Sequence, residues 1–431
     1  MSILLESKII NERTGFFKGL VPQQNFLEPI KFHIYTPVYT LSSDESEGRT
    51  NVLSISGAGM SPEEAKAKCL GEAIERYCWY HAHSWIEQIP TVFDKIRKQA
   101  IAPSTYGLFS NAQYAIKGFP FVPFREDTEL HWVEGVRLRD QEQLYVPAQL
   151  CFPGVKDRYQ LSYYTTTGLA CSDNYFKAVY TSICEVIERD AFMLMWTNRI
   201  KPRLMEIEWE GQCGERKTLE YLNTSAYTCL IFSLYTDIDV PVLIAAMVNK
   251  ESTSPYVSFG AACDLDMAKA VRKSISESLH NLNFLIWAHQ HNVGIKWEGN
   301  KTNLKYFDEH ALLYSNRHMK KEVSFILSGP HSKERITLPD VAQDLDYEEG
   351  VQTVTNLLAK EGYQTIVVDL TPEEIRNVGC YVIKALIPGF MDLGFDRYYW
   401  LGTRRIYEVP HKLGFNKRNE RELNTFPHPF P

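Results

Sequence analysis

The sequence lacks the markers of several protein classes. Lys and Arg number 46 against 53 Asp and Glu, a net charge of −7, so it has no general basic footprint for nucleic acid, although a local basic groove is compatible with this balance. No run of about 18 apolar residues occurs, which excludes a membrane-spanning helix. The first residues, MSILLESKIINERTG, do not form a signal peptide. The nine cysteines include no CxxC, which in a chain of 431 residues indicates reduced thiols in a cytoplasmic protein.

The common catalytic and nucleotide signatures are also missing. There is no GxxxxGK[ST] P-loop, the glycines at 57 and 59 do not complete GxGxxG, and no GxSxG occurs. Two HxH pairs, His81/His83 and His289/His291, have no third ligand nearby in the sequence, so we interpret them as ordinary surface or helix-end histidines. A nucleotide site in this chain would therefore have to be built differently.

The composition is that of a globular protein, with 44% hydrophobic and 23% charged residues. Residues 226–236, 240–248 and 365–370 are rich in β-branched and aromatic residues and predict strands. Strands and helices mix without a regular βαβ alternation. We therefore predict an α+β fold rather than a doubly wound sheet.

An internal repeat organises the chain. The segments 57–80 and 168–196 both run from a glycine through an alanine and a cysteine into E-x-x-E-R, and a third copy covers 260–287. The first two copies share five anchors at a constant spacing: Ala65/Ala178, Glu72/Glu185, Ile74/Ile187, Glu75/Glu188 and Arg76/Arg189. The third keeps Ala270 and Glu277 but has Ser278, Leu279 and His280 where the second has Val186, Ile187 and Glu188.

Each copy has the apolar spacing of a helix and opens on a glycine after a β-rich run, at 49–57, 161–168 and 254–260. The predicted unit is a strand, a tight glycine turn and a helix. The three copies would pack as α/β layers.

The acidic helices carry the candidate chemistry. Residues three and four apart share a helix face, so the two glutamates and the arginine of each E-x-x-E-R lie together. Four carboxylates and two guanidiniums are costly to gather without neutralising ions. Mg²⁺ takes carboxylate and phosphate oxygens, and arginine matches phosphate, so two facing helices would form a cage for a Mg-nucleotide. A single copy would be read as a solvated helix face with ion pairs, but the matching anchors of two copies favour a site.

These motifs resemble the YcaO family. The two E-x-x-E-R helices, the stretch CEVIERDAF, the late IPGFMDLGFDR and the terminal PHPFP are similar to the stand-alone D-protein of an azoline-forming cyclodehydratase, and the resemblance extends over 51–431. It implies an ATP-dependent reaction in which a Cys, Ser or Thr side chain of a ribosomally made precursor peptide attacks the preceding amide carbonyl. ATP phosphorylates the resulting oxygen, and phosphate leaves to give a thiazoline or oxazoline.

The resemblance also assigns roles to residues. It implies ATP and Mg²⁺ as cofactors, with nucleotide contacts from Glu72, Glu75, Arg76, Glu185, Glu188, Arg189, Glu277 and His280. The expected metal ligands are Glu72, Glu75, Glu185 and Glu188. The alternating prolines of the tail, Pro427, Pro429 and Pro431, would place the terminal carboxylate at the catalytic centre, where the tail orients groups for proton transfer.

Three departures from the family pattern matter, and one of them is that residues 65–72, AKAKCLGE, lack the small hydroxyl residue common before the first motif's glutamate. Many members have lysine in the first glycine turn, where this chain has Ala58, and glutamine where it has His280. The same ATP site would also serve a YcaO enzyme that makes a thioamide or an amidine, although the PHPFP tail favours the azoline-forming branch. The hypothesis that the chain is a catalytically reduced scaffold subunit is supported by Ala58 and His280 alone, and the intact Glu and Arg sets weigh against it.

We divide the chain into a strand-rich segment at 1–50, the YcaO ATP-binding domain at 51–400 and a C-terminal segment at 401–431. This length leaves no room for a fused E1-like, leader-binding domain, so we expect that domain on a separate partner protein. A flavin-dependent dehydrogenase is a further candidate member of the complex, and a homodimer is the default oligomer. We expect no nucleic-acid or membrane partner.

Overall fold

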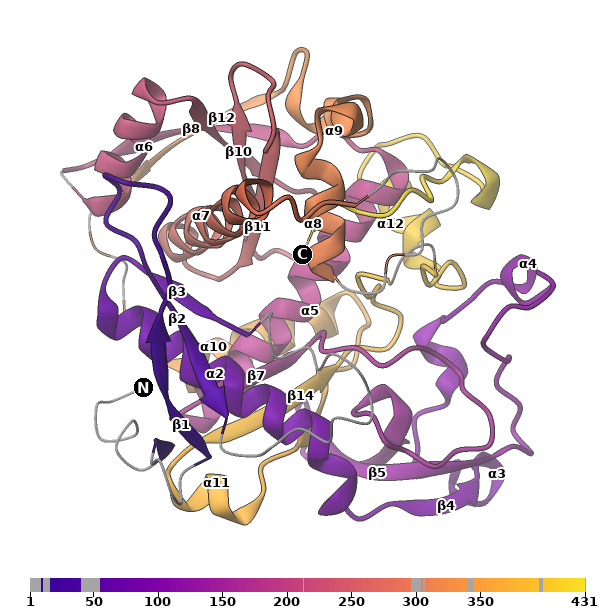
Figure 1. Cartoon of the computed structure of the whole chain (residues 1–431). Helices are drawn as coiled ribbons and strands as arrows, with labels where there is room; N and C mark the ends of the chain where they lie inside the picture. The colour runs from indigo at the N-terminus through magenta and orange to yellow at the C-terminus, as the bar shows by residue number, and fades with distance from the viewer. Residues whose placement is uncertain are drawn as a thin grey trace.

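The computed structural model describes residues 9–10, 16–39, 55–211, 213–295, 304, 307–339, 341, 344–394 and 398–430. Three sheets organise these residues (Figure 1). The smallest has the order β1-β2-β3, with bounds Phe17–Pro22, His33–Tyr39 and Gly57–Gly59. It joins the N-terminal segment to the first repeat, because β2 pairs antiparallel with β3.

The two larger sheets are mostly antiparallel. One has the order β11-β10-β9-β8-β12, with bounds Val257–Cys263, Val242–Asn249, Tyr227–Ser233, Arg203–Trp209 and Lys333–Leu338, and only its β12–β8 pair is parallel. The other has the order β4-β5-β13-β14-β7, with bounds Ile89–Val92, Glu129–Arg137, Ile366–Asp369, Tyr381–Leu386 and Leu169–Ser172, and β6 (Glu142–Pro147) pairs with β5. The three predicted strands are present as β9, β10 and β13, and the mixed helix-and-sheet fold is confirmed.

The helices cover these sheets. Their bounds are α2 Pro62–His81, α3 Phe93–Ile96, α4 Asn111–Tyr114, α5 Tyr175–Asn198, α6 Gly214–Thr224, α7 Met267–Gln290, α8 Phe307–Ser315, α9 Lys320–Leu327, α10 Tyr347–Lys360, α11 Glu373–Asn377 and α12 Arg405–Lys412. The three long helices of the repeats begin at side-chain caps, where Ser61, Asn174 and Asp266 accept hydrogen bonds from backbone N–H groups of the first turn. The sequence therefore defines where each repeat helix starts.

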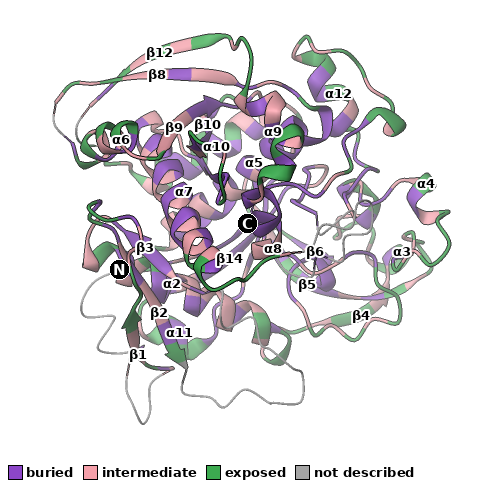
Figure 2. Cartoon of the chain, turned by 45° about the horizontal axis from the view of Figure 1, so that its top comes forward, coloured by how far each residue is buried: buried purple, intermediate pink, exposed green. Residues whose placement is uncertain are grey.

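Helix α5 lies between the two larger sheets. The even residues of β10, such as Val242 and Ile244, pack with α5, and so do the odd residues of β14, such as Ile383 and Ala385. The odd residues of β10 face α7 instead. Because β10 is thus buried on both faces, its sequence is a continuous run of apolar residues. Figure 2 shows α5 as a largely buried helix in the middle of the molecule.

The glycines of the repeats differ from the predicted turns. Strand β3 begins at Gly57, β7 begins after Gly168, and β11 runs through Gly260. A Cβ on Gly57 would lie 2.0 Å from the Cys69 backbone nitrogen, and one on Gly260 would lie 2.3 Å from that of Ser278. The sequence-based turn was therefore wrong for these two copies: their glycines let a strand pack directly on its own helix. Only Gly168, with φ of +78°, has the left-handed conformation that a tight turn requires.

The domain boundaries at 50/51 and 400/401 remain a prediction. The described part of 1–50 contains β1 and β2, which continue the sheet of the first repeat. Residues of the C-terminal segment, such as Ile406, Val409 and Phe430, belong to the same core cluster as α5. Both ends of the chain thus pack on the central unit.

Candidate active site

The three repeats close into a ring. Each long helix contacts its own strand and also the strand of another copy: α2 contacts β7, α5 contacts β11, and α7 contacts β3. The alanine anchors Ala65, Ala178 and Ala270 are all fully buried, and the carboxylates of the three helices influence one another's pKa values. This arrangement brings the acidic positions of the three helices toward one centre.

The first repeat supplies Glu72, Glu75 and Arg76 from α2. The Arg76 guanidinium lies 3.5 Å from Glu72 Oε1 and 3.6 Å from Glu75 Oε1. Its Nη1 is buried and has no hydrogen-bond partner among the described residues. A buried guanidinium N–H without a partner is costly, and an incoming anion would satisfy it.

The second repeat supplies Glu185, Glu188 and Arg189 from α5. Arg189 pairs with Glu185 at 2.6 Å and donates to Thr167 Oγ1 at 2.8 Å. Glu188 is only 5% exposed, and its Oε2 accepts a hydrogen bond from the Cys263 backbone N–H of β11. As in the first repeat, one arginine nitrogen, Arg189 Nε, is buried without a hydrogen-bond partner in the described part of the chain.

The third repeat supplies Glu277 and His280 from α7. His280 Nε2 and Ser56 Oγ lie 2.9 Å apart in a hydrogen bond that joins α7 to the residue before β3. Burial, reinforced by the nearby charge of Lys68, lowers the pKa of His280 to about 4. The imidazole is therefore neutral at pH 7.

The carboxylates of the three helices influence one another. Burial raises the pKa of Glu75 to about 8, and the charge of Glu185 on the facing helix adds to the rise. Burial likewise raises the pKa of Glu188 to about 8, with Glu277 and Glu185 contributing. The pKa values of Glu72 and Glu277 are also raised by burial. The positive side chains of the protein therefore do not fully balance the negative charge of these carboxylates.

This donor set fits a magnesium-bound nucleotide. Mg²⁺ is usually held by one or two carboxylates together with waters and substrate phosphates, and Glu72, Glu75, Glu185 and Glu188 offer carboxylates of that kind. Among the described residues, no three His, Cys, Asp or Glu side chains already gather as a metal site. The unpartnered nitrogens of Arg76 and Arg189 are suited to phosphate oxygens. The residues therefore suit a metal that arrives with its anion.

The tail is buried beside this centre. Residues 427–430 are buried, and the rings of His428 and Phe430 lie 5.9 and 5.1 Å from the Phe192 ring of α5, one turn beyond Glu188. The Tyr314 hydroxyl donates to the carbonyl of Pro427 at 2.6 Å. Pro431 lies outside the described residues. Burial lowers the pKa of His428, and the charge of Arg189 adds to the effect, so the tail lies within electrostatic range of the second motif.

The sequence analysis did not identify several polar residues of the centre. Lys273 precedes Glu277 by one turn of α7. Burial lowers its pKa, but the charges of Glu188 and Glu277 raise it further, so the net pKa is raised. The i,i+4 spacing of Lys273 and Glu277 in the sequence could have indicated this pair. Lys384 is fully buried in β14 and donates to the carbonyls of Thr165 and Thr167 at 2.7 and 2.8 Å. A lone lysine within the apolar run YVIKAL was its signal.

A second missed set holds the loop after β14 against α5. The Thr167 hydroxyl, which accepts from Arg189, donates to Asp392 at 2.7 Å. Arg405 of α12 joins Asp190 and Asp237 at 2.6 and 2.8 Å, and all three side chains are at most 3% exposed. No local sequence pattern links these residues, since they come from distant segments.

No described helix is both long and apolar enough to cross a membrane. All nine cysteines are free thiols.

Comparisons with known proteins agree with this geometry. No curated protein matches the sequence. Among solved structures, a heterocyclase in complex with substrate and cofactor has a TM-score of 0.78 at 20% identity, covering 99% of this chain and 57% of its own length. The chain therefore spans little more than half of that protein.

Two other solved structures are similar over nearly their whole length. The YcaO of Methanopyrus kandleri bound with AMPPCP and Mg²⁺ has a TM-score of 0.60 at 19% identity, covering 90% of this chain and 88% of its own. The E. coli microcin synthetase McbBCD complex with pro-MccB17 bound has a TM-score of 0.65 at 14% identity, covering 96% of both chains. At these identities the likeness shows the fold.

The family itself is shown by a sequence model. The model of the YcaO cyclodehydratases, described as ATP- and Mg²⁺-binding, matches residues 56–391, which include all three repeats and strand β14. The family resemblance predicted from the two E-x-x-E-R motifs is confirmed, and this chain belongs to the YcaO family of ATP- and Mg²⁺-binding cyclodehydratases.

Proposed function

We propose that the chain is the cyclodehydratase subunit that closes Cys, or Ser and Thr, side chains of a ribosomally made precursor peptide into thiazolines or oxazolines. The observation that carries this proposal is the ring of three helices. Its carboxylates have raised pKa values, and its two arginines each have a buried nitrogen that forms no hydrogen bond with a described residue. Such a centre is suited to a nucleotide that brings both its phosphates and its metal. The tail, whose Phe430 ring lies 5.1 Å from the Phe192 ring of α5, supports a second functional element of the proposal.

The proposed reaction needs positioning and charge neutralisation. The thiol or hydroxyl bonds to the carbon of the preceding amide, and the amide oxygen takes the γ-phosphoryl group of ATP, which releases ADP. The phosphorylated oxygen then leaves as phosphate, while the nucleophile and the amide nitrogen each lose a proton. Arg76 and Arg189 would contact the phosphates during this transfer. Such electrostatic neutralisation supplies most of the catalysis that phosphoryl transfer requires.

Bound Mg²⁺ would neutralise phosphate charge, and Glu72, Glu75, Glu185 and Glu188 are the residues proposed to hold it. Its arrival would also lower the pKa values of these carboxyls, because a nearby cation favours the charged form. Glu277 and the neutral His280 would complete the polar wall on the α7 side. Lys273, whose charge interacts with both Glu188 and Glu277, would limit repulsion between them when the nucleotide is absent.

The tail is proposed to orient groups for proton transfer. Its backbone is held by Tyr314, His310 and Tyr399, whose side chains bond to the carbonyls of residues 427, 428 and 426. This attachment would position Pro427 and Pro429 for that role, in which Pro431 is proposed to share.

Partner proteins are part of the proposal. Two of the similar structures are complexes, one with substrate and cofactor and one a synthetase assembly with pro-MccB17 bound. By analogy, an E1-like protein would capture the leader of the precursor and present its core to this chain. A flavin dehydrogenase that oxidises azolines, and a homodimer of this chain, are the finer parts of the same proposal.

The test is Mg-ATP binding by the purified chain, followed by turnover with the partner and a Cys-containing precursor. We expect binding by the unaltered chain and by Glu87→Gln, an exposed control, and loss of binding in Glu75→Gln and Glu188→Gln. Turnover would appear as loss of one water per ring in the mass of the peptide. Mg-ATP binding that is equal in all four proteins would refute the proposed site.

A further inference from the structure

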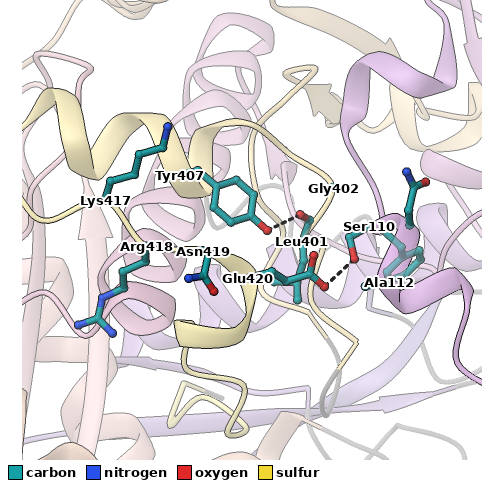
Figure 3. A pocket seen from close by; sticks show the side chains of 11 residues that line it. Ser110, Ala112, Leu401, Gly402, Tyr407, Lys417, Arg418, Asn419 and Glu420 are labelled. Atoms are coloured by element: carbon teal, nitrogen blue, oxygen red, sulfur yellow. Dashed lines mark hydrogen bonds between the residues drawn. The ribbon is translucent and has the colours of Figure 1, made fainter.

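A hollow separate from the ring of helices lies between the segment around α4 and the C-terminal segment (Figure 3). It is open to solvent and has a volume of about 600 Å³, and none of its lining residues belongs to α2, α5 or α7. Residues 109–112 form one side, and residues of 401–420 form the other. Ligand sites commonly measure about 300–1,000 Å³, so this hollow, here named the C-terminal groove, is large enough to hold part of a ligand.

Hydrogen bonds hold the walls of the groove in place. Ser110 Oγ donates to Glu420 Oε1 at 2.7 Å, which links one side to the other. The Tyr407 hydroxyl donates to the Leu401 carbonyl at 2.9 Å and keeps its ring along the wall. Figure 3 shows both bonds at the centre of the view. The Glu420 carboxylate is fixed in the wall by this bond but keeps its negative charge, and Leu401 and the Tyr407 ring also line the hollow.

The rim of the groove is basic. The whole chain has a net charge of −7, but residues 401–431 contain more Lys and Arg than Asp and Glu. Lys417 is exposed and forms no ion pair with any described residue. Arg418 donates to the carbonyl of Glu422, at 3.0 Å, which does not neutralise its charge. Among the lining residues, two cations therefore outnumber the one carboxylate, that of Glu420, beside a hollow that is partly apolar through Phe109, Leu401 and Tyr407.

The groove also lies where the chain enters the tail. The Glu420 carbonyl accepts from the backbone N–H of Leu423, and the next residue, Asn424, is bonded to the carbonyls of Trp196 and Thr197 at the end of α5. The buried residues 427–430 follow at once. A chain bound in the groove would therefore lie beside the point at which the tail reaches the active site.

We infer that the C-terminal groove binds an acidic, partly apolar stretch of the peptide substrate. This inference rests on the proposed function, since it assigns that substrate a second contact outside the catalytic centre. The two cations would attract the acidic side chains and the apolar floor would take a Leu or Phe. Such a contact would hold the peptide while its reactive residue reaches the ring of helices, raising the local concentration of the reacting segment.

The test uses a fluorescein-labelled synthetic peptide that alternates Glu, Leu and Gly, beside the same peptide with Lys in place of Glu. Binding is followed by fluorescence anisotropy without ATP. Lys417→Glu reverses one charge of the rim, and Ala112→Trp fills the hollow from its exposed position in α4 without changing charge. Lys321→Glu, an exposed lysine of α9, is the control with the same charge change.

We expect the acidic peptide to bind and the Lys peptide not to bind. Lys417→Glu and Ala112→Trp should each weaken acidic-peptide binding by about fivefold or more, because one adds repulsion and the other removes space. Lys321→Glu should bind as the unaltered chain does, and Mg-ATP binding should stay the same in all variants. Equal binding of the two peptides, no binding of either, or unchanged binding in both groove variants would overturn the inference.

This assay separates the two proposals. It contains neither nucleotide nor turnover, so a groove that fails to bind leaves the cyclodehydratase function standing. Conversely, Mg-ATP binding that fails the active-site test does not alter the peptide titration.

Discussion

Replacing Glu188 with Gln measures how much the ionisation of this buried carboxyl lowers the free energy of unfolding. Burial raises the pKa of Glu188 from 4.5 to about 8, with Glu277 and Glu185 contributing. Between these two values the folded chain holds a proton that the unfolded chain has released. Unfolding therefore releases a proton, and rising pH lowers the free energy of unfolding.

The expected loss is about 1.4 kcal/mol per pH unit for this one group, or about 2 kcal/mol between about pH 5.5 and about pH 7. Glutamine stays neutral and can still accept from the Cys263 backbone N–H, so Glu188→Gln should not show this loss. Urea unfolding without nucleotide, followed by tryptophan fluorescence at several pH values, measures the difference. Glu87→Gln, at an exposed position, should follow the unaltered chain.

The same variant should lose Mg-ATP binding while it gains stability at neutral pH. This combination is the mark of a residue kept for function, because stabilising changes at such sites cost activity. Parallel pH profiles for the unaltered chain and Glu188→Gln would refute the reasoning, since they would mean that Glu188 ionises as easily in the folded chain as in the unfolded one.

Three further predictions concern the tail, the buried ion pairs and the repeat glycine. Adding a few residues after Pro431 should sharply reduce heterocycle formation while leaving Mg-ATP binding largely intact, and a fully active extended chain would refute the role of the tail. Arg405→Ala should lower the free energy of unfolding by about 3–5 kcal/mol, because it leaves two buried aspartates without their cation; a urea-unfolding loss below about 1 kcal/mol would contradict this. Gly57→Ala should be destabilising, because its Cβ would lie 2.0 Å from the Cys69 backbone nitrogen; a thermal midpoint equal to that of the unaltered chain would show that the strand can move away from the helix.

The helices of the site could be predicted because their signals are local. Helical spacing places Glu72 beside Arg76 and Glu185 beside Arg189 whatever surrounds them, and the structure has both ion pairs. The repeat added a second kind of information, since equivalent residues of a repeated unit take equivalent places. That is why the buried anchors, such as Ala65 and Ala178, could be named in advance.

The rest depended on contacts between distant segments. Whether a glycine serves a turn or a close approach cannot be decided from the glycine alone: Gly57 and Gly260 meet backbone atoms of helices that start several residues later. In the sequence, Lys384 has no evident partner within its apolar strand. In the fold, the carbonyls of Thr165 and Thr167 lie within hydrogen-bond distance of its ammonium group. The ring, in which each helix rests on the strand of another copy, is a property of three units together.

His280 stands where the family resemblance implies a glutamine, and we expect this departure to leave nucleotide binding unchanged. Burial and the charge of Lys68 lower its pKa to about 4, so at pH 7 the side chain is an uncharged group that forms a hydrogen bond with Ser56 at 2.9 Å. A glutamine amide has the same charge and can form the same bond. His280→Gln should therefore keep the Mg-ATP affinity within about twofold, because one neutral hydrogen-bonding group replaces another. Isothermal titration at pH 7 measures this. A tenfold change in either direction, or a step in affinity near pH 6.5 that only the unaltered chain shows, would mean that the imidazole acts through its charge.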